Sequence, residues 1–453
     1  MATSITSDTA AAGGHAASDK HPKGLYVLFL TEMWERFSFY TVGGMWALYV
    51  QNQQQGFGWP QDQATNVWSY YQMFVYASPL FGGILADTKL GYRRSVMIGG
   101  FFFMLGHALL AVPSEPVMFA ALACLVIGNG FFKPNVSAMV GNLYPEGSHL
   151  KDRAYNIFYM GINVGAFLAP VVAEFMTQNF GYHPAFAMGA LGMLISVFVL
   201  WKGKRHIEMA DRKPGSFGGA KAPSSAAAVA VDAPPKGVSH QNPIDLIPDS
   251  RRILALIVIF LVVIVFWMVF HQNQTTLTYW ADNNTDWAVS GIISNAINPA
   301  WVIILTFPLV WFWKQLDKRG LEPATPTKMA IGMCLTGLSF FIMYFAGKAG
   351  GDVGRVSPWW LIGAYGVLTL GELMLSPMGL SLVSKVAPVR LRGIMMGGWF
   401  GATAIGNKLT AIGVLWDDMP HSSFFALLGG MALFMAVVLT LLLKPLKKAM
   451  PGV

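Results

Sequence analysis

Charged residues are scarce in this chain. Asp, Glu, Lys and Arg make up 12% of its 453 residues, about half the share of a soluble globular protein. A soluble chain of this length would need charged surfaces over two or three domains. The apolar residues instead fall in runs of about twenty, the length that a helix needs to cross a membrane. A soluble enzyme and a disordered protein are therefore both excluded.

Cysteine is also scarce, with only Cys124 and Cys334 in the whole chain. Each lies within an apolar run, so neither a disulfide framework nor a metal site is expected. The first two dozen residues contain no arginine and no apolar core. They resemble neither a signal peptide nor a transit peptide, so we expect the first hydrophobic span to direct insertion.

Positive charge exceeds negative charge, and the formal net charge is +8. Twenty-six of the 31 Lys and Arg residues lie in the two termini and in every second connection between apolar runs. Only Lys348 and Arg355 lie in the other connections, and Arg36, Lys133 and Lys408 lie inside apolar runs. This asymmetry is the positive-inside pattern and places both termini in the cytoplasm. The basic charge therefore indicates orientation and not a nucleic-acid partner.

The apolar runs predict twelve membrane-spanning helices, six in each half of the chain. Those of the first half cover residues 25–50, 66–86, 95–112, 117–140, 155–177 and 184–201. Those of the second half cover residues 253–280, 288–313, 328–347, 358–383, 393–415 and 422–443. The intervening residues are polar at both ends and rich in Pro, Gly, Ala and Ser, which is typical of a flexible cytoplasmic linker.

Two six-helix bundles joined by a long linker form the architecture of the major facilitator superfamily, in which the bundles rock around a site near the membrane midplane. We therefore predict an all-α polytopic membrane protein with the major facilitator fold. Its predicted parts are a cytoplasmic N-terminal tail (1–24), an N-terminal bundle (25–201), the linker (202–252), a C-terminal bundle (253–443) and a cytoplasmic C-terminal tail (444–453).

The loop after the second span supports this architecture. Gly83, Asp87, Gly91, Arg93 and Arg94 form the pattern G-x-x-x-D-x-x-x-G-x-R-R, which resembles the cytoplasmic loop signature of that superfamily. Glycines permit close packing there, and an aspartate near a helix end can form a charge latch with the arginines. The alternative is an ordinary turn whose basic residues anchor it at the membrane surface.

The first span carries ionisable side chains at membrane depth, where each charge costs about 2.5–3.5 kcal/mol on insertion scales. Glu32, Arg36 and Tyr40 recur every four residues and therefore share one helix face, with Glu35 beside them. Two carboxylates share one guanidinium, so one of them lacks full compensation, which suits reversible protonation. The alternative is a static ion pair that ties this span to its neighbours.

Five motifs in order resemble the proton-dependent oligopeptide transporter family, a branch of the major facilitators. The motif E-x-x-E-R-F-x-x-Y runs from Glu32 to Tyr40 in the first span. The other four occupy residues 131–137, 158–165, 371–381 and 396–400, in the fourth, fifth, tenth and eleventh spans. The resemblance covers nearly all spans and leaves out the N-terminal tail and the linker.

This resemblance implies a role for each ionisable residue of the spans. Glu32, Glu35 and Arg36 would handle the proton, and Arg36 with Tyr40 would also hold the carboxylate of a peptide. Lys133 would add a second positive charge at that end. Independently of the family, Arg36 and Lys133 on opposed helices could hold a carboxylate between them. The alternative for Lys133 is snorkelling to the membrane surface.

The opposite end of the pocket is implied in the same way. Glu372 in the tenth span would receive the amino terminus of the peptide, which gives a dipolar pocket suited to a zwitterion. The alternative for Glu372 is a buried ion pair with Lys133. Five hydrogen-bonding and aromatic side chains at family positions would line the pocket: Tyr76, Asn163, Trp267, Asn298 and Trp399. For Tyr76 and Trp399, packing or interfacial anchoring is the alternative.

The sequence departs from the family in the seventh span. His271 stands where the family usually has Glu, and Gly43 stands where bacterial members often have the Arg that faces this acid. Either charge alone would be uncompensated, so we infer that the extracellular gate closes without that salt bridge.

Two further residues keep alternatives open. His271 takes over part of the acid's task in proton coupling, because imidazole titrates near neutral pH, or it is a neutral, hydrogen-bonded core histidine. Lys408 in the eleventh span either snorkels towards the cytoplasm or pairs with an acid.

These features together predict a proton-coupled symporter of di- and tripeptides that works by alternating access, as a monomer in the plasma (inner) membrane. Its expected partners are short peptides, protons and the lipid bilayer, with no metal or organic cofactor. One alternative is a proton-coupled carrier of another small anion or zwitterion, and another is a peptide sensor that does not transport. An enzyme is not expected, because the sequence shows no nucleophile–base set, metal-ligand spacing or phosphate loop.

Overall fold

The computed structural model describes residues 21–144, 150–211, 246–388 and 391–451. The elements in these ranges are helices, and the only β-type pairing among the described residues is a single bridge between Thr285 and Val356. Most of the predicted N-terminal tail and the middle of the predicted linker lie outside the described residues.

Six long helices form the first half of the chain. They are α1 (Lys23–Gln51), α2 (Gln61–Leu85), α3 (Tyr92–Leu110), α4 (Glu115–Asn142), α5 (Leu150–Phe180) and α6 (Tyr182–Lys202). Three short elements follow α2 and α6: the π-helical turn η1 (Ala86–Leu90), the helix α7 (Lys204–Ile207) and the 3₁₀ turn η2 (Glu208–Ala210).

Six spans also form the second half, and three of them are composite. The first runs through α8 (Asp249–Phe270), η4 (His271–Gln274) and α9 (Thr276–Asn283). Two others combine η5 (Gly291–Ala296) with α10 (Ile297–Asp317), and α13 (Arg392–Leu409) with η7 (Thr410–Trp416). The rest are α11 (Thr325–Ala349), α12 (Pro358–Val386) and α14 (His421–Ala449). The prediction of twelve helical spans is thus confirmed.

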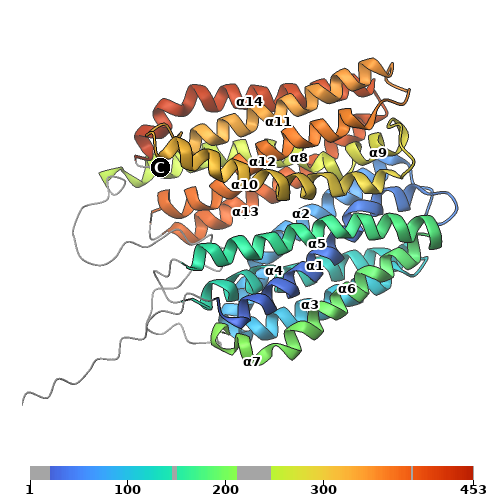
Figure 1. Cartoon of the computed structure of the whole chain (residues 1–453), viewed down its shortest axis with the longest axis horizontal. Helices are drawn as coiled ribbons and strands as arrows, with labels where there is room; N and C mark the ends of the chain where they lie inside the picture. The colour runs from blue at the N-terminus through green and yellow to red at the C-terminus, as the bar shows by residue number, and fades with distance from the viewer. Residues whose placement is uncertain (1–20, 145–149, 212–245, 389–390, 452–453) are drawn as a thin grey trace, which may run out of the picture.

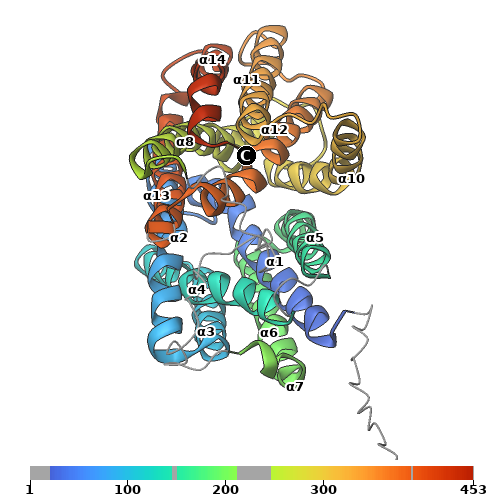
Figure 2. The same ribbon diagram turned by 90° about the vertical axis from the view of Figure 1, so that its left-hand side faces the viewer.

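The spans form two groups that lie side by side, with the helices running nearly along the long axis of the molecule (Figure 1). Seen from one end, α1 to α6 form the first group, and α8 with α10 to α14 form the second (Figure 2). The groups meet where α2 contacts α13 and where α5 contacts α10. The start of α1 and the end of α14 lie at the same end of the molecule (Figure 1), which we call the termini side; the opposite end is the far side.

Eight spans among the described residues are long and apolar enough to cross a membrane, judged by length and composition. They correspond to α4, α5, α6, α8 with α9, η5 with α10, α11, α12 and α14. The remaining long helices, α1, α2, α3 and α13, are more polar. In α1 the charged side chains Glu32, Glu35 and Arg36 are at most 3% exposed, so its charges face protein and not lipid.

Small residues let the helices of the first group approach closely. A Cβ added to Gly82 of α2 would lie 1.9 Å from the carbonyl oxygen of Gly130 in α4. A Cβ added to Gly165 of α5 would lie 2.2 Å from the carbonyl oxygen of Met33 in α1. Both approaches exclude any larger residue, as is common where membrane helices pack on each other.

The predicted boundaries of the linker and of the C-terminal tail differ from those in the structure. Residues 204–210 of the linker form α7 and η2 and pack on the first group, where Ile207 and Ala210 are fully buried. Asn142 of α4 donates a hydrogen bond to the carbonyl oxygen of Ala210. The last residues of the linker, from Asp249, already belong to α8, and α14 continues to Ala449 through most of the predicted tail.

Candidate functional site

A cavity of about 530 Å³ lies between the two helix groups. Its lining comes from α1, α2, α4 and α5 of the first group and from α8, α10, α12 and α13 of the second. The predicted site residues that line it are Glu32, Arg36, Tyr40, Tyr76, Lys133, Asn163, Trp267, Asn298, Glu372 and Trp399. The structure therefore brings together residues that lie more than 300 positions apart in the sequence.

The charged cluster of α1 is asymmetric. Arg36 donates hydrogen bonds from Nε and Nη2 to the two carboxylate oxygens of Glu35. The same Nε lies 3.5 Å from Oε1 of Glu32, whose Oε2 has no hydrogen-bond partner among the described residues. Glu35 is thus held by a bidentate pair and lies outside the cavity lining, whereas Glu32 lines the cavity. Of these two carboxylates, Glu32 is therefore the one that faces the cavity and has an oxygen without a partner among the described residues.

Two cations face the cavity from the first helix group. Arg36 lies on α1, and its guanidinium carbon is 4.7 Å from the centre of the Phe39 ring. Lys133 lies on α4, and its ammonium nitrogen is 5.0 Å from the centre of the Tyr76 ring on α2. Lys133 therefore points into the protein rather than to the membrane surface, which excludes snorkelling in this state.

Among the described residues, Glu372 of α12 is the one carboxylate that the second group contributes to the cavity. It accepts a hydrogen bond of 2.9 Å from Asn298 of α10, which also lies 2.9 Å from the hydroxyl of Thr369. Glu372 makes no ion pair within the described residues, so the alternative of a pair with Lys133 does not hold in this state. A carboxylate held only by an amide can still accept a cationic ligand.

Aromatic rings form the walls between the charged ends. Trp267 of α8 and Trp399 of α13 both line the cavity. Trp399 fits because α12 has Gly379 opposite it, where an added Cβ would lie 1.6 Å from the indole ring. The indole nitrogen of Trp267 has no hydrogen-bond partner among the described residues. This nitrogen is buried, although buried indole N–H groups usually find a hydrogen-bond partner.

His271 lies behind this wall. Its ring stacks on Trp267 with centroids 5.0 Å apart, and the Tyr76 ring lies 5.7 Å away. The side chain is 6% exposed, and neither ring nitrogen has a hydrogen-bond partner among the described residues. His271 is therefore a buried core residue, but the hydrogen bonds expected of a core histidine are absent among the described residues.

Several lining residues escaped prediction although their spacing gave a signal. Tyr159 of α5 lines the cavity one helical turn before Asn163, whose amide donates to the Tyr159 carbonyl. Thr403 of α13 lines it one turn after Trp399, and its hydroxyl donates to the Trp399 carbonyl. Residues three or four positions from a functional side chain share its helix face, so both could have been found from the sequence.

The cavity extends towards the termini side, because Ile84 near the end of α2 and Met396 near the start of α13 line it. On the far side, a contact between two uncharged side chains joins the groups. Gln72 of α2 donates a hydrogen bond to Gln274 of η4. An added Cβ on Gly43 of α1 would lie 3.1 Å from the Gln274 amide nitrogen, so Gln274 occupies the space beside this glycine.

Two further contacts join the groups on the far side. Glu174 of α5 accepts hydrogen bonds from the backbone N–H and the hydroxyl of Ser290, at the start of η5. Lys408 of α13 donates to the hydroxyl of Ser69 at 3.1 Å, and its ammonium lies 3.8 Å from the centre of the Tyr70 ring. Lys408 thus neither reaches the termini side nor pairs with an acid in the described part of the chain, so both alternatives for this residue are wrong here.

The predicted loop signature lies on the termini side, at the junction of α2 and α3. Gly83 lies in the last turn of α2 and Asp87 lies in η1. Gly91 has a φ of 79°, a conformation that favours glycine, and its N–H donates to the carbonyl of Ala86. Arg93 lies 3.9 Å from Asp211, beyond η2. The loop is therefore connected to the segment that follows α6, a partner that the sequence pattern did not suggest.

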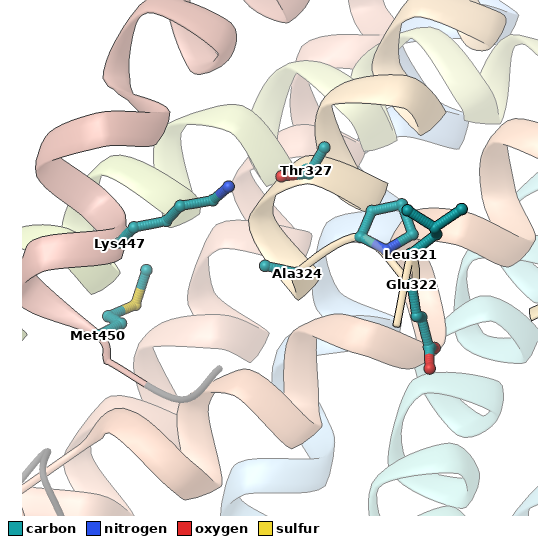
Figure 3. Close-up of a pocket in the computed structure, with 7 residues that line it drawn as sticks. Leu321, Glu322, Ala324, Thr327, Lys447 and Met450 are labelled. Atoms are coloured by element: carbon teal, nitrogen blue, oxygen red, sulfur yellow. The ribbon is translucent and has the colours of Figure 1, made fainter. Parts of the chain in front are cut away.

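A separate groove on the termini side lies between the end of α14 and the loop before α11 (Figure 3). Lys447 reaches towards Thr327, while the carboxylate of Glu322 points away from it (Figure 3). Glu322 instead pairs with Lys328. This groove has a volume of about 690 Å³ but contains none of the predicted site residues.

Comparison with known families identifies similarity along most of the chain. A model of the POT family matches residues 93–231 and 225–416. A di-/tripeptide transporter of Lactococcus lactis subsp. lactis (strain IL1403) is 32% identical, over 95% of this chain and 97% of the relative. An uncharacterised transporter of Bacillus subtilis (strain 168) is 33% identical, over 96% of both chains.

Comparison with solved structures gives the same result. A crystal structure of a variant of a POT peptide transporter in complex with alafosfalin superposes with a TM-score of 0.83. Its sequence is 31% identical, and the alignment covers 95% of this chain and 96% of the other. The predicted fold class, an all-α polytopic membrane protein of the major facilitator type, is confirmed.

Proposed function

Because this chain belongs to the POT family of transporters, we propose that it carries di- and tripeptides across the membrane together with protons, by alternating access. The di-/tripeptide transporter of Lactococcus lactis supports this substrate class, since the two chains align over nearly their whole length. The chain is a transporter and not an enzyme.

The distribution of charge in the central cavity carries this proposal. Arg36 and Lys133 of the first group offer two cations, and Glu372 of the second group offers one carboxylate. A short peptide at neutral pH has a carboxylate at one end and an ammonium at the other. Binding it across the cavity would pair both ends with opposite charges and link the two helix groups.

Proton coupling would depend on Glu32. Its carboxylate has one oxygen near Arg36 and one without a hydrogen-bond partner among the described residues. Protonation of Glu32 would weaken its attraction to Arg36 and free the guanidinium for the peptide carboxylate. Glu35 would keep the guanidinium oriented through its bidentate pair. His271 of the second helix group, buried beside Trp267, is a second candidate for a residue that takes up and releases the proton during transport.

The orientation in the membrane follows from the positive-inside pattern. With both termini in the cytoplasm, the termini side is the cytoplasmic side and the described state is open to the cytoplasm. The far side, closed by the Gln72–Gln274 and Glu174–Ser290 contacts, would be the extracellular gate. Gly43 and His271 stand where the family often has an arginine and a glutamate. We therefore infer that this gate closes without a salt bridge between two such residues.

Uptake by purified protein in liposomes tests this function. An imposed proton gradient, acidic outside, should drive accumulation of radiolabelled Ala-Ala, and unlabelled di- and tripeptides should compete with it. Tetrapeptides and single amino acids should compete weakly. No acid-stimulated uptake of any short peptide would contradict the proposal.

The same assay separates the alternatives. Competition by nitrate or by another small anion or zwitterion, without competition by peptides, would identify a carrier of a different substrate. Saturable peptide binding without flux would identify a sensor.

A further inference from the structure

A second groove lies on the outer surface of the first helix group, between α3 and α6 at the termini side. Its volume is about 480 Å³. Further into the helices the lining is apolar and includes Met97 of α3 and Trp201 of α6. At the ends of the helices on the termini side the lining carries Arg93, Arg94 and Lys204. None of the described residues that line it is acidic. The groove therefore combines an apolar trough with a cationic rim.

The position of this groove places it against lipid. α3 and α6 lie at the edge of the first group that is farthest from the second group (Figure 2). Leu191, Leu194, Phe198 and Trp201 follow one face of α6 and are 45–58% exposed. This stripe leads along the helix to the groove, and Phe101 of α3 is also exposed, at 53%. Exposed apolar side chains on a membrane helix contact acyl chains.

The cationic rim lies at the level where lipid headgroups begin. Trp201 ends the apolar stripe of α6, as tryptophan commonly does at the boundary between hydrocarbon and water. The ammonium of Lys204 lies 5.9 Å from the centre of the Trp201 ring, and that of Lys202 lies 5.8 Å from the Phe198 ring. These lysines extend from apolar surface towards water, as snorkelling side chains do.

The positive charge of the rim is only partly neutralised. Arg93 lies 3.9 Å from the carboxylate of Asp211, which also accepts a hydrogen bond of 3.0 Å from the Arg93 backbone N–H. Arg94 and Lys204 form no ion pair within the described part of the chain. Two exposed cations therefore face the same opening, and an anion placed between them would meet donors from both α3 and α7.

We propose that this groove binds an anionic phospholipid of the leaflet on the termini side. Its phosphate lies between Arg94 and Lys204, and one acyl chain follows the apolar stripe of α6. A phosphate suits this rim because arginine and lysine donate charge-assisted hydrogen bonds to its oxygens. The trough and the stripe favour a lipid over a free phosphate, which would leave them exposed to water. The groove of Figure 3 differs, because its lining contains the acidic residue Glu322 in addition to a single lysine, Lys447.

Native mass spectrometry of the full-length protein in mild detergent tests the proposal. The protein is titrated with dioleoyl phosphatidylglycerol, with dioleoyl phosphatidylcholine, and with glycerol 3-phosphate as a headgroup without acyl chains. The test variant is Arg94→Gln with Lys204→Gln. The control variant is Lys444→Gln with Lys447→Gln, which removes two exposed lysines from α14 on the same side. Gel filtration and the melting temperature verify that both variants fold.

The wild-type protein should bind phosphatidylglycerol more tightly than phosphatidylcholine. The Arg94/Lys204 variant should bind phosphatidylglycerol roughly tenfold more weakly, since each basic residue contributes measurably to attraction of anionic lipid. Its binding of phosphatidylcholine and the behaviour of the control variant should not change.

Three results would overturn the proposal. Equal affinity of the wild type for the two lipids, which needs no variant, would remove the preference for negative charge. An equal loss in the control variant would show that the basic surface acts without a specific groove. Displacement of phosphatidylglycerol by glycerol 3-phosphate at equal concentration would identify a site for a soluble anion.

Discussion

Glu32 and Glu35 are three residues apart on one helix but have different surroundings. Glu35 is fully buried and uses both oxygens on Arg36, whereas Glu32 has one oxygen near Arg36 and faces the cavity. A group that exchanges protons must reach water and must have more than one stable set of partners. In the described state Glu32 lines the cavity and has an oxygen without a hydrogen-bond partner among the described residues, whereas Glu35 lies outside the lining and uses both oxygens on Arg36.

Replacement of Glu32 by Gln should therefore uncouple transport. The ratio of internal to external Ala-Ala in liposomes under a proton gradient should fall to about one, since a carrier that moves no proton can only equilibrate its substrate. Exchange of labelled for unlabelled peptide should continue. Glu115→Gln, an exposed acid at the start of α4, is the matched control and should accumulate peptide like the wild type. Accumulation by the Glu32→Gln variant would assign the proton to another group.

Glu372 should determine affinity for the amino end of the peptide. Glu372→Gln should raise the KM for Ala-Ala by roughly tenfold to a hundredfold, since a hydrogen bond to a charged group contributes about 1.5–3 kcal/mol. N-acetylated Ala-Ala has no ammonium group and should bind the variant and the wild type equally. Competition assays with both compounds measure the effect. An equal loss for both would indicate a general distortion of α12 instead.

The sequence was informative about which residues share the cavity and less informative about their partners. Charges at helical spacing in an apolar run were sufficient to single out the α1 cluster. The environment of His271 could not be read in this way, because its neighbour Tyr76 comes from a distant helix. For Lys408 the sequence left two alternatives open, snorkelling or pairing with an acid, and the structure instead has contacts with Ser69 and Tyr70.

At the scale of elements, the contact between α5 and η5 joins the groups on the far side. Ser290 caps η5, and Glu174 accepts both its N–H and its hydroxyl. A carboxylate at the start of a helical segment also interacts favourably with the exposed N–H groups there.

Glu174→Gln should weaken closure of the far side. The loss of a charge-assisted pair, worth about 1.5–3 kcal/mol, should shift the population towards a state open on that side. Spin labels at positions 179 and 289, in a background with Cys124 and Cys334 replaced by Ser, should report longer distances.

Gln178→Ala is the control for this variant. It removes a neighbour that donates to Glu174 within α5 and leaves the contact with Ser290 intact. An unchanged distance distribution in Glu174→Gln would show that other contacts hold the far side closed.

The loop between α11 and α12 gives a prediction for the dependence of stability on pH. Burial alone would raise the pKa of Asp352, but hydrogen bonds from Ser422 and the charge of Lys348 outweigh it and lower the pKa below its usual value. The Ser422 N–H lies 2.6 Å from the carboxylate. A lowered pKa stabilises the fold above the unfolded value of about 3.9, and this contribution disappears as the pH falls through the folded value.

Asp352→Asn should therefore lower the melting temperature at pH 7 and have less effect the further the pH falls below about 4. Asparagine keeps the positive φ of 67° at this position accessible, so the variant removes the charge and not the turn. Melting temperatures of the purified protein measured between pH 3 and pH 7 give the comparison. A constant difference over this range would show that the carboxylate charge does not stabilise the loop.

The long helices were predictable because twenty apolar residues leave few alternatives to a membrane span. The ends of the predicted linker were not, since α7 and η2 contain only seven residues and are too short for a clear periodic pattern. They fold because Ile207 and Ala210 are buried against the first group. That surface exists only once the helices have assembled, so a linear reading of the chain does not reveal it.

At the scale of the whole molecule, the sequence predicted two groups of six helices but not which side the cavity opens to. A transporter must form states open to either side, and the same residues specify all of them. In the described state, polar contacts join the groups on the far side, while Ile84 and Met396 line the cavity towards the termini side. Which state is populated depends on small free-energy differences between contacts that no sequence motif records.

The most direct test of proton-coupled peptide transport is the movement of protons when peptide is the only driving force. Liposomes that contain the protein and the pH-sensitive dye pyranine are prepared with equal pH on both sides, and Ala-Ala is added outside. The interior should acidify as peptide enters, at a rate that saturates with peptide concentration, and liposomes without protein should not respond. Entry of labelled Ala-Ala with no change in internal pH would contradict the coupling of peptide to protons.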